Sequence, residues 1–525
     1  MGMVETYNPK RSATPRDMKD AMIIATDNEY DHWHDPAPRE FTKSQRPHTT
    51  ILIAGLTAAH DMFIQAAFTG AGYNMIALDV PDNDSLRYGK EYGNRGQCNP
   101  TYFTVGNLVK YLVSLRRSGV SSEEIVKNYI FITIGSCGPC RFGTYITEYR
   151  KALRDAGFDG FRVSFFEQTK GVEKADGDEP GLHFGPRFIA NMTRAIVAGD
   201  TLNALAYRIR PYEVNPGDTD RAFNKSKELL CDALSNNKSY MKAMWKARRE
   251  FATVKVDRSR IKPKVSIIGE FWAMTTEGDG NYHLQRFLEQ EGAEVEVQPV
   301  AAWIQYLIWQ AQWDLKQRME LRGTDKGGED GSKFSLEGVN TRKKWLLLKA
   351  AEWAIPALYK VFGPLIGLNG YKLPDMNKIA EVSHDFYNTN LKGGEGHMEV
   401  GKLILNVAKK KTNMTLSVKP FGCMPSSAVS DGVQALITER YPDAIFLPIE
   451  TSGDGAVNVY SRVQMQLFKA KQMVQQEAEQ LSKEKNMPLK EMQAKVAEHP
   501  KAQNALHHSP HYAASTGINA LYEFT

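Results

Sequence analysis

Two cysteines stand three positions apart in the segment GSCGPCRFG, residues 135–143. A glycine and a proline separate Cys137 from Cys140, and an amphipathic run follows them. Thiols at this spacing occur in disulfides, redox-active pairs, zinc sites and iron–sulfur sites. The chain has 5 cysteines, an odd number, and its composition is that of a cytosolic protein, which argues against a disulfide framework. The motif alone leaves the other three kinds of site open.

The other cysteines share a common setting. Cys98, in RGQCNPTYF, lies at the start of a predicted helix, and Cys423, in VKPFGCMPSS, follows a predicted strand and precedes a helix. Such turns line the carboxyl edge of an α/β sheet, where these folds build their sites, and helix N-termini favour thiolates. Gly422 and the neighbouring prolines give a bulky cofactor close approach to the backbone. The predicted metal ligands are Cys98, Cys137, Cys140 and Cys423; Cys231 falls inside a helix and is assigned to packing.

The spacing of these cysteines bears on the metal. Structural zinc usually takes two close pairs of ligands, and this chain has one. A thioredoxin-type pair at Cys137 and Cys140 leaves Cys98 and Cys423 without a role. An iron–sulfur cluster held between two domains uses all four thiols. Of the three kinds of site, we therefore favour an iron–sulfur cluster, with zinc and a redox pair as the alternatives.

Three further residues are candidates beside the cysteines. Glu395 and His397 follow paired glycines ahead of a predicted helix, whose N-terminus would stabilise a carboxylate by about 0.3–1 kcal/mol. They are candidate catalytic residues that move a proton beside the cluster; helix capping and structural support are the alternative. Arg141 directly follows Cys140 and would offset cluster charge or hold a phosphate, unless it forms a surface ion pair. With Gly422 it is a candidate cofactor-binding residue.

Apolar, β-branched runs alternate with helical patterns in two parts of the chain. The predicted strands lie at 49–56, 74–80, 128–135 and 161–168, and then at 264–272, 293–300, 414–423 and 444–451. This rhythm is typical of parallel α/β sheets. We predict two Rossmann-like, doubly wound domains with a helical insert and a C-terminal helix. The expected divisions are an N-terminal extension (1–48), domain 1 (49–175), a helical segment (176–262), domain 2 with helical insertions (263–460) and a helical tail (461–525).

Composition narrows the function classes. The chain has 525 residues, 42% hydrophobic and 24% charged, with a formal net charge of +5 spread along its length. No basic block with interleaved aromatic residues is present, which argues against nucleic-acid binding. The most apolar stretch, 345–368, contains charges and prolines, so we expect no membrane span and a packing role against a core or a partner. The start lacks a secretory signal, and we predict a cytoplasmic protein.

Several motifs in this order resemble one family. They are EYGNRGQCNPTYFTVGNLVKYL, GPCRFGTYITEYRKALRDAGF, IIGEFWAMTTEGDGNYHLQRFLEQEGAEVEVQPVAAWIQYL, GGEGHMEVGKLI and VKPFGCMPSSAVSDGVQALI. Together they resemble the 2-hydroxyacyl-CoA dehydratase superfamily, closest to the cluster-binding part of acyl-CoA dehydratase activase-related proteins. The resemblance covers roughly 50–460. It implies Rossmann-like domains around a [4Fe–4S] cluster bound by Cys98, Cys140 and Cys423, with Cys137 an addition to the pattern.

The resemblance also implies partners and a reaction. A separate ATP-dependent activator with its own iron–sulfur cluster would deliver a low-potential electron, and this chain has no G-x-x-x-x-G-K-[ST] loop of its own. In true dehydratases the electron reduces an acyl-CoA thioester carbonyl to a ketyl radical, from which a hydroxyl group leaves. We expect an oligomer or a complex subunit. The alternative is a non-catalytic [4Fe–4S] electron carrier or cluster-assembly subunit, and a dinucleotide-binding oxidoreductase is disfavoured because IAGLTAAHD lacks two glycines of G-x-G-x-x-G.

Overall fold

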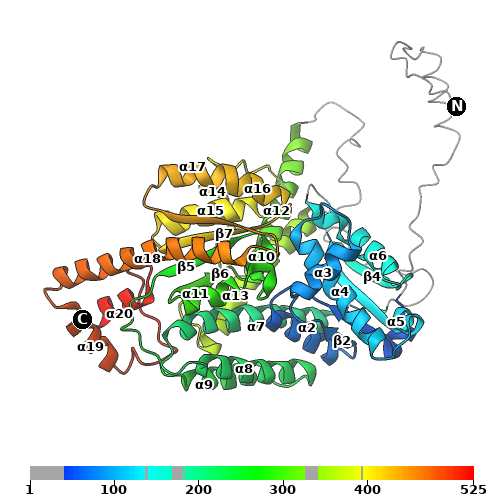
Figure 1. Ribbon diagram of the computed structural model, residues 1–525, viewed down its shortest axis with the longest axis horizontal. Coiled ribbons are helices and arrows are strands. Elements are labelled where there is room, and N and C mark those ends of the chain that lie inside the picture. The colour runs from blue at the N-terminus through cyan, green and yellow to red at the C-terminus, as the bar shows by residue number, and fades with distance from the viewer. Residues whose placement is uncertain (1–40, 136–139, 168–180, 184, 325–340, 392–393) are drawn as a thin grey trace, which may run out of the picture. The chain divides into compact units, whose positions relative to one another are not determined.

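Two four-stranded parallel sheets of the same strand order organise the computed structural model (Figure 1), which describes residues 41–135, 140–167, 181–183, 185–324, 341–391 and 394–525. The first sheet, in the order β2-β1-β3-β4, contains β1 (Thr50–Ile53), β2 (Asn74–Ala77), β3 (Tyr129–Gly135) and β4 (Arg162–Glu167). The second, in the order β6-β5-β7-β8, contains β5 (Lys264–Gly269), β6 (Glu294–Val297), β7 (Met414–Pro420) and β8 (Ile445–Thr451). The predicted α/β class with two Rossmann-like domains is confirmed.

Helices cover the first sheet because its strands are apolar on both faces. They are α2 (Ala58–Gly70), α3 (Asn83–Tyr92), α4 (Asn99–Arg117), α5 (Ser122–Asn128) and α6 (Tyr145–Asp155), with the short 3₁₀ turns η1 (Lys43–His48) and η2 (Arg141–Thr144). On one face Leu52 and Phe131 pack with Leu108 of α4 and Tyr149 of α6. On the other, Ile51 and Ile130 join the ring of Phe68 from α2. This burial fixes the strand ends from which the candidate site is built.

The second sheet has its own helices. These are α10 (Phe271–Thr275), α11 (Leu284–Gln290), α14 (Met376–Ser383), α15 (Gly396–Ala408), α16 (Met424–Ala428), α17 (Gln434–Arg440) and α18 (Ala456–Glu484), with a 3₁₀ turn η4 (Asp279–Asn281) and a π-helical turn η5 (Val429–Val433). The start of α18 packs on this sheet through Val459, Val463 and Leu467. Further along, α18 packs on α19 (Leu489–Glu498) and α20 (Thr516–Phe524), so the tail is part of the core of its own chain.

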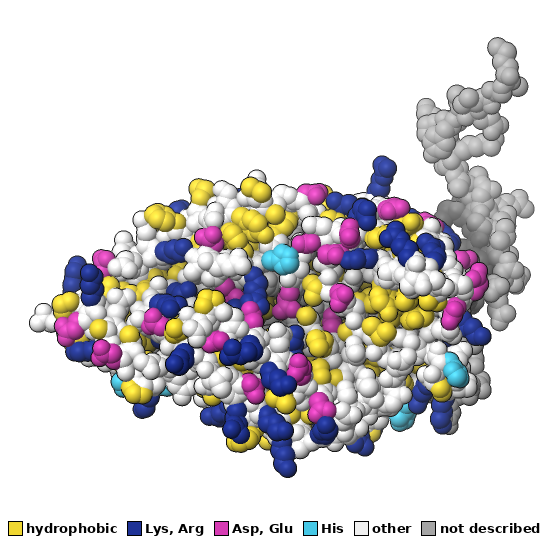
Figure 2. Space-filling view, turned by 60° about the horizontal axis from the view of Figure 1, so that its bottom comes forward, with side chains coloured by type: hydrophobic (Ala, Val, Ile, Leu, Met, Phe, Trp, Pro, Cys, Tyr) yellow, Lys and Arg dark blue, Asp and Glu magenta, His cyan; other side chains and the backbone are white. Residues whose placement is uncertain are grey.

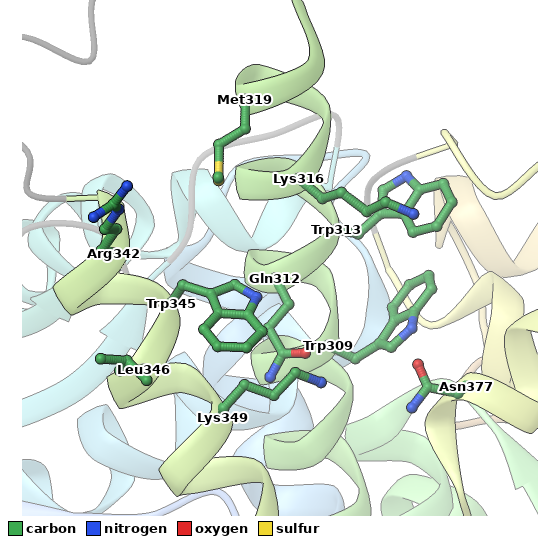
Figure 3. Close-up of a pocket in the computed structure, with 10 residues that line it drawn as sticks. All are labelled: Trp309, Gln312, Trp313, Lys316, Met319, Arg342, Trp345, Leu346, Lys349 and Asn377. Carbon is green, nitrogen blue, oxygen red and sulfur yellow. The ribbon is translucent and has the colours of Figure 1, made fainter. Parts of the chain in front are cut away.

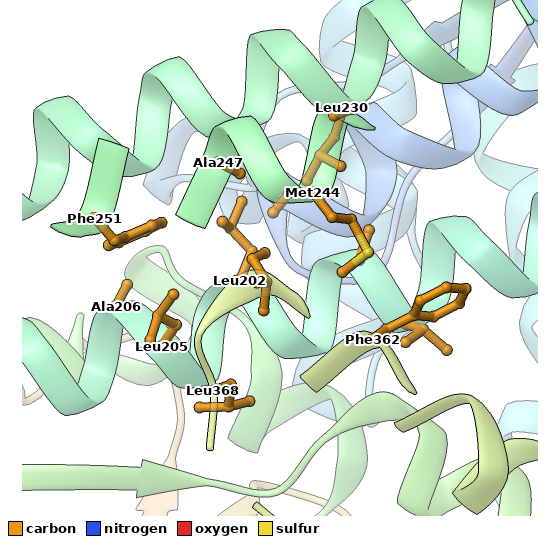
Figure 4. Packing of buried hydrophobic residues seen from close by; sticks show 14 of the residues in the cluster. Leu202, Leu205, Ala206, Leu230, Met244, Ala247, Phe251, Phe362 and Leu368 are labelled. Carbon is orange, nitrogen blue, oxygen red and sulfur yellow. The ribbon is translucent and has the colours of Figure 1, made fainter. Parts of the chain in front are cut away.

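A layer of helices is built from two parts of the chain: the segment between β4 and β5, and the insertion between β6 and β7. It consists of α7 (Pro186–Ile209), the 3₁₀ turn η3 (Arg210–Tyr212), α8 (Asp218–Ser235), α9 (Tyr240–Ala252), α12 (Val300–Thr324) and α13 (Thr341–Ile366). Leu202 and Leu205 of α7 meet Met244 and Phe251 of α9 and Phe362 of α13 in its core (Figure 4). The helical segment expected at 176–262 therefore forms α7 to α9 within its described residues.

The surface adds two observations. On the face drawn in Figure 2, lysines and arginines are interspersed with aspartates and glutamates. The first half of α13 exposes Leu346, Leu347 and Trp353, by 61%, 62% and 76%. Among the described helices, none combines the length and the apolar character needed to cross a membrane.

Candidate functional site

Three of the cysteines begin helices at the carboxyl edges of the two sheets. Cys98 is the N-cap of α4, Cys140 is the N-cap of η2, the next element after β3, and Cys423 is the N-cap of α16, the next element after β7. Parallel α/β sheets place their sites at this edge, because strand ends and helix starts meet there. The predicted positions of these three thiols in strand-to-helix turns or helix starts are therefore confirmed.

The turns that hold Cys98 and Cys423 pack against each other. The backbone N–H of Asn99 donates to the carbonyl oxygen of Phe421 at 3.0 Å. Gly422 has φ +77°, and a Cβ on it would lie 3.2 Å from the Cα of Cys98. Glycine is needed here both for the left-handed backbone and for the close approach of the two turns. Gly422 thus joins the two sheets at the thiols.

The Cys98 thiol is also linked to the helix that follows Cys140. Its Sγ lies 3.1 Å from the Tyr145 hydroxyl and 3.1 Å from Thr101 Oγ1, and the side chain is 5% exposed. Cys140 is half-buried, and its Sγ accepts the N–H of Phe142 at 3.5 Å. Two hydroxyl groups and a backbone N–H therefore surround these sulfur atoms, and such donors stabilise a thiolate or a metal-bound sulfur.

Burial disfavours the charged form of the thiols in the metal-free protein. Burial, together with the carboxyl groups of Glu270 and Glu395, raises the pKa of Cys140 to about 12, against the N–H of Phe142, which lowers it. The pKa of Cys423 is raised by burial and then by Glu270. Cys140 and Cys423 therefore stay protonated at neutral pH unless positive charge arrives, and a metal that binds them releases their protons.

Three glutamates lie close enough to influence these thiols. Glu270 is the N-cap of α10 and accepts the N–H of Ala273 at 2.8 Å, while Glu399 accepts the Ser426 hydroxyl at 2.8 Å. Burial raises the pKa of Glu270 and raises that of Glu399 to about 7. For Glu395, burial and then the charges of Glu270 and Glu399 raise the pKa well above its usual value. No described lysine or arginine forms an ion pair with these three glutamates.

The backbone around Glu270 is built for close approach. Gly269 ends β5 with φ +129°, and a Cβ there would lie 2.1 Å from the carbonyl oxygen of Val418 in β7. The N–H of Glu270 donates to that same oxygen at 2.9 Å. The carboxyl group of Glu270 is thereby fixed beside the turn of Cys423. An acidic residue placed directly after an apolar strand was a signal for it in the sequence, and Glu399 lies one helical turn beyond Glu395.

His397 lies in an aromatic enclosure. Its Nδ1 is 3.2 Å from the Tyr306 hydroxyl, and its ring centroid is 4.8 Å from that of Tyr387 and 5.5 Å from that of Trp309. The side chain is 1% exposed, and burial lowers its pKa to about 4. Of the two candidate catalytic residues, Glu395 is the one whose charge reaches a cysteine.

The remaining predicted residues fall in different places. Arg141 is half-buried in η2 and forms no ion pair with the part of the chain that the structure describes. Cys137 lies outside the described residues. Cys231 lies on α8 and packs against the helical layer, with its thiol 3.9 Å from the carbonyl oxygen of Met62, which agrees with the packing role expected for it.

The side chains at the site decide which kind of metal group could bind there. Within the described ranges, no three histidine, cysteine, aspartate or glutamate side chains are arranged to hold one metal ion. A four-iron cluster binds each ligand at a different corner, so its ligands stand farther apart than those of one ion. Three thiols from separate turns and a glycine at the contact of two of these turns fit such a group.

A second feature lies beside the aromatic enclosure. A cavity of about 790 Å³ opens between α12 and α13, and Figure 3 shows the rings of Trp309, Trp313 and Trp345 around it with Lys316 and Lys349. Trp309 contacts both this cavity and His397. The cavity therefore adjoins the aromatic side of the candidate site. Sequence reasoning did not find it, because the two helices come from separate segments.

The sequence was also compared with known proteins: no family model and no curated protein matches it.

Proposed function

We propose that the chain is a cytoplasmic iron–sulfur protein of the 2-hydroxyacyl-CoA dehydratase type. It accepts low-potential electrons from an ATP-dependent activator and uses them for reductive chemistry on an acyl-CoA. One observation carries the proposal: the Cys98 turn of the first sheet packs directly on the Cys423 turn of the second, with Gly422 at the contact. The charges of Cys98 and Cys140 also influence each other. Free thiols in the described chain suit a reducing compartment.

Each residue has a role in this proposal. Cys98, Cys140 and Cys423 would hold a [4Fe–4S] cluster, which supplies one-electron chemistry when bound. The Tyr145 and Thr101 hydroxyl groups orient the Cys98 sulfur. Glu270 caps α10, and its charge acts on Cys140 and Cys423. Glu395 acts electrostatically on Cys140 and would bind or release a proton beside the cluster.

The first experiment is anaerobic purification of the full chain followed by iron, sulfide and zinc analysis. We expect about four irons and as many sulfides per chain. Serine variants of Cys98, Cys140 and Cys423 should each lose most of the iron, whereas Cys231→Ser should keep it. Zinc without sulfide, or iron that survives the three variants, would refute the proposal.

A second experiment separates an enzyme from an electron carrier. The dithionite-reduced protein is examined by EPR with and without an acyl-CoA. A spectrum that shifts with the acyl-CoA supports substrate binding at the cluster. A cluster spectrum that no acyl-CoA changes would favour the electron carrier or assembly subunit and remove the enzymatic part of the proposal.

A further inference from the structure

The two sheets have the same strand order and share several elements around the third strand in sequence. In each, a pair of packed helices precedes the third strand: α3 and α4 before β3, and α14 and α15 before β7. In each, a short helix begins just after that strand, with Cys140 and Cys423 as its N-cap. The N-cap of α4 is Cys98, and the N-cap of α15 is Glu395. Glu395 therefore stands at the position where the repeat of the fold would put a fourth cysteine.

The backbone brings Glu395 to the cysteine turns. Gly394 has φ +68°, and a Cβ on it would lie 2.6 Å from Pro425, at the start of the helix that Cys423 caps. Glu395 is half-buried, and its Oε1 accepts the indole N–H of Trp303 at 3.1 Å. Trp303 stacks on Phe271, the neighbour of Glu270, with ring centroids 4.9 Å apart. The carboxyl group is held from one side, between the Cys423 helix and Glu270.

The carboxyl groups of the other two glutamates each accept a hydrogen bond within the protein. The carboxyl group of Glu270 caps its own helix through the N–H of Ala273, and Glu399 is 1% exposed and bonded to Ser426. Glu395 occupies an N-cap position without capping its own helix. Glu395 is also half-buried, whereas Glu399 is 1% exposed, so its carboxyl group is the more accessible of these two.

We propose that Glu395 is the fourth ligand of the site and binds, through its carboxylate, the iron that Cys98, Cys140 and Cys423 leave free. This inference rests on the proposed function. A carboxylate is a harder and more weakly held ligand of cluster iron than a thiolate. It can therefore give way to an incoming substrate oxygen, while the three thiolates keep the cluster in place. The Trp303 N–H holds the carboxylate in position when it leaves the iron.

The test uses the full chain, purified anaerobically and loaded with ⁵⁷Fe and sulfide, in four forms: wild type, Glu395→Cys, Glu395→Gln and Glu399→Gln as the matched control one helical turn away. In Mössbauer spectra of the wild type we expect one distinct iron site among the four. Glu395→Cys should make that iron resemble the others, and its loss on mild oxidation should slow by roughly tenfold. Glu395→Gln should lose it faster, and Glu399→Gln should keep the distinct iron.

The outcomes separate this inference from the proposed function. A wild type without a cluster would refute both. A cluster whose distinct iron is the same in Glu395→Gln and Glu395→Cys as in the wild type would overturn only the inference, as would four equivalent irons in the wild type. Circular dichroism shows whether each variant is folded, and the two substitutions at position 395 act in opposite directions, so a common folding defect cannot imitate the expected pattern.

Discussion

The turns after β1 and β5 hold the same place in two sheets of the same order, yet they contain different chemistry. After β1, the Thr57 hydroxyl lies 2.7 Å from His60 Nδ1, and His60 Nε2 lies 3.2 Å from Asp200. Asp200 accepts the N–H groups of Val300 and Ala301 at 2.7 and 2.9 Å. His60 Nε2 makes this contact with Asp200 without a hydrogen bond of good geometry, while both Asp200 oxygens accept backbone N–H groups. The network therefore joins α2, α7 and α12 and serves stability.

After β5, the polar groups are left open to further partners. Glu270 influences Cys140, Cys423 and Glu395, and no cation in the described chain pairs with it. Glu399 Oε2 is buried without a hydrogen-bond partner among the described residues. The comparison teaches that the same strand end can serve two purposes in one topology. After β1 it leads into contacts that stabilise the fold, and after β5 it leads into carboxyl groups that have no cation partner among the described residues.

Of the substitutions that test this comparison, those at Asp200 should change the free energy of unfolding most. Asp200→Ala leaves the Tyr359 hydroxyl and two backbone N–H groups without their acceptor, so we expect a loss of about 3–5 kcal/mol in the free energy of unfolding. Urea unfolding of the metal-free protein measures it. Asp200→Asn, which keeps one oxygen, should lose less, and Glu270→Gln less than about 1 kcal/mol. Equal losses for Asp200→Ala and Glu270→Gln would contradict the distinction between the two networks.

A glycine pair sharpens the comparison. Gly55, just after β1, and Gly269, the last residue of β5, have similar φ angles of +123° and +129°. Of the two, only Gly269 lies close to a backbone oxygen, which would be 2.1 Å from an added Cβ. We expect Gly269→Ala to cost roughly 3 kcal/mol or more, because β5 and β7 must separate. Gly55→Ala carries only the conformational strain, about 1–2 kcal/mol. Thermal unfolding should rank them in this order, and the reverse ranking would refute the close contact.

The smallest effect is a pH dependence at Glu399. Its pKa is raised from 4.5 to about 7, so the folded state prefers the protonated form, and the wild type loses stability as the pH rises between these values. Glu399→Gln removes this loss. The variant should match the wild type near pH 4 and exceed it at pH 8 by on the order of 1–3 kcal/mol in the metal-free protein. A difference between the two proteins that does not change with pH would show that Glu399 does not titrate in this range.

Local patterns predicted most of the fold. Apolar runs such as ILI before Gly55 and VSIIG at β5 mark buried strands because parallel strands are covered on both faces. The same reasoning placed Cys98, Cys140 and Cys423 at helix starts, since each follows a turn and precedes a helical pattern. Strands and helix starts are determined mainly by residues close together in the chain, so local sequence patterns predict them.

Other features depend on contacts that no local pattern encodes. The network of His60 and Asp200 joins residues from separate helices, and the aromatic enclosure of His397 needs α12 beside α15. Glu270 was missed because an acidic residue at a helix start also serves as an ordinary N-cap, and it does cap α10. Its relation to the cysteines becomes visible only when β5 and β7 are neighbours.

The contact between Asn99 and Phe421 has a consequence for biogenesis. The first sheet can form early in synthesis, but the turn that completes the site belongs to β7, which emerges late. Until then, Cys98 and Cys140 lack their counterpart across the domains. A prosthetic group bound between these turns would therefore be delivered to a nearly finished polypeptide, and shortened chains that end before β7 should leave the ribosome without it.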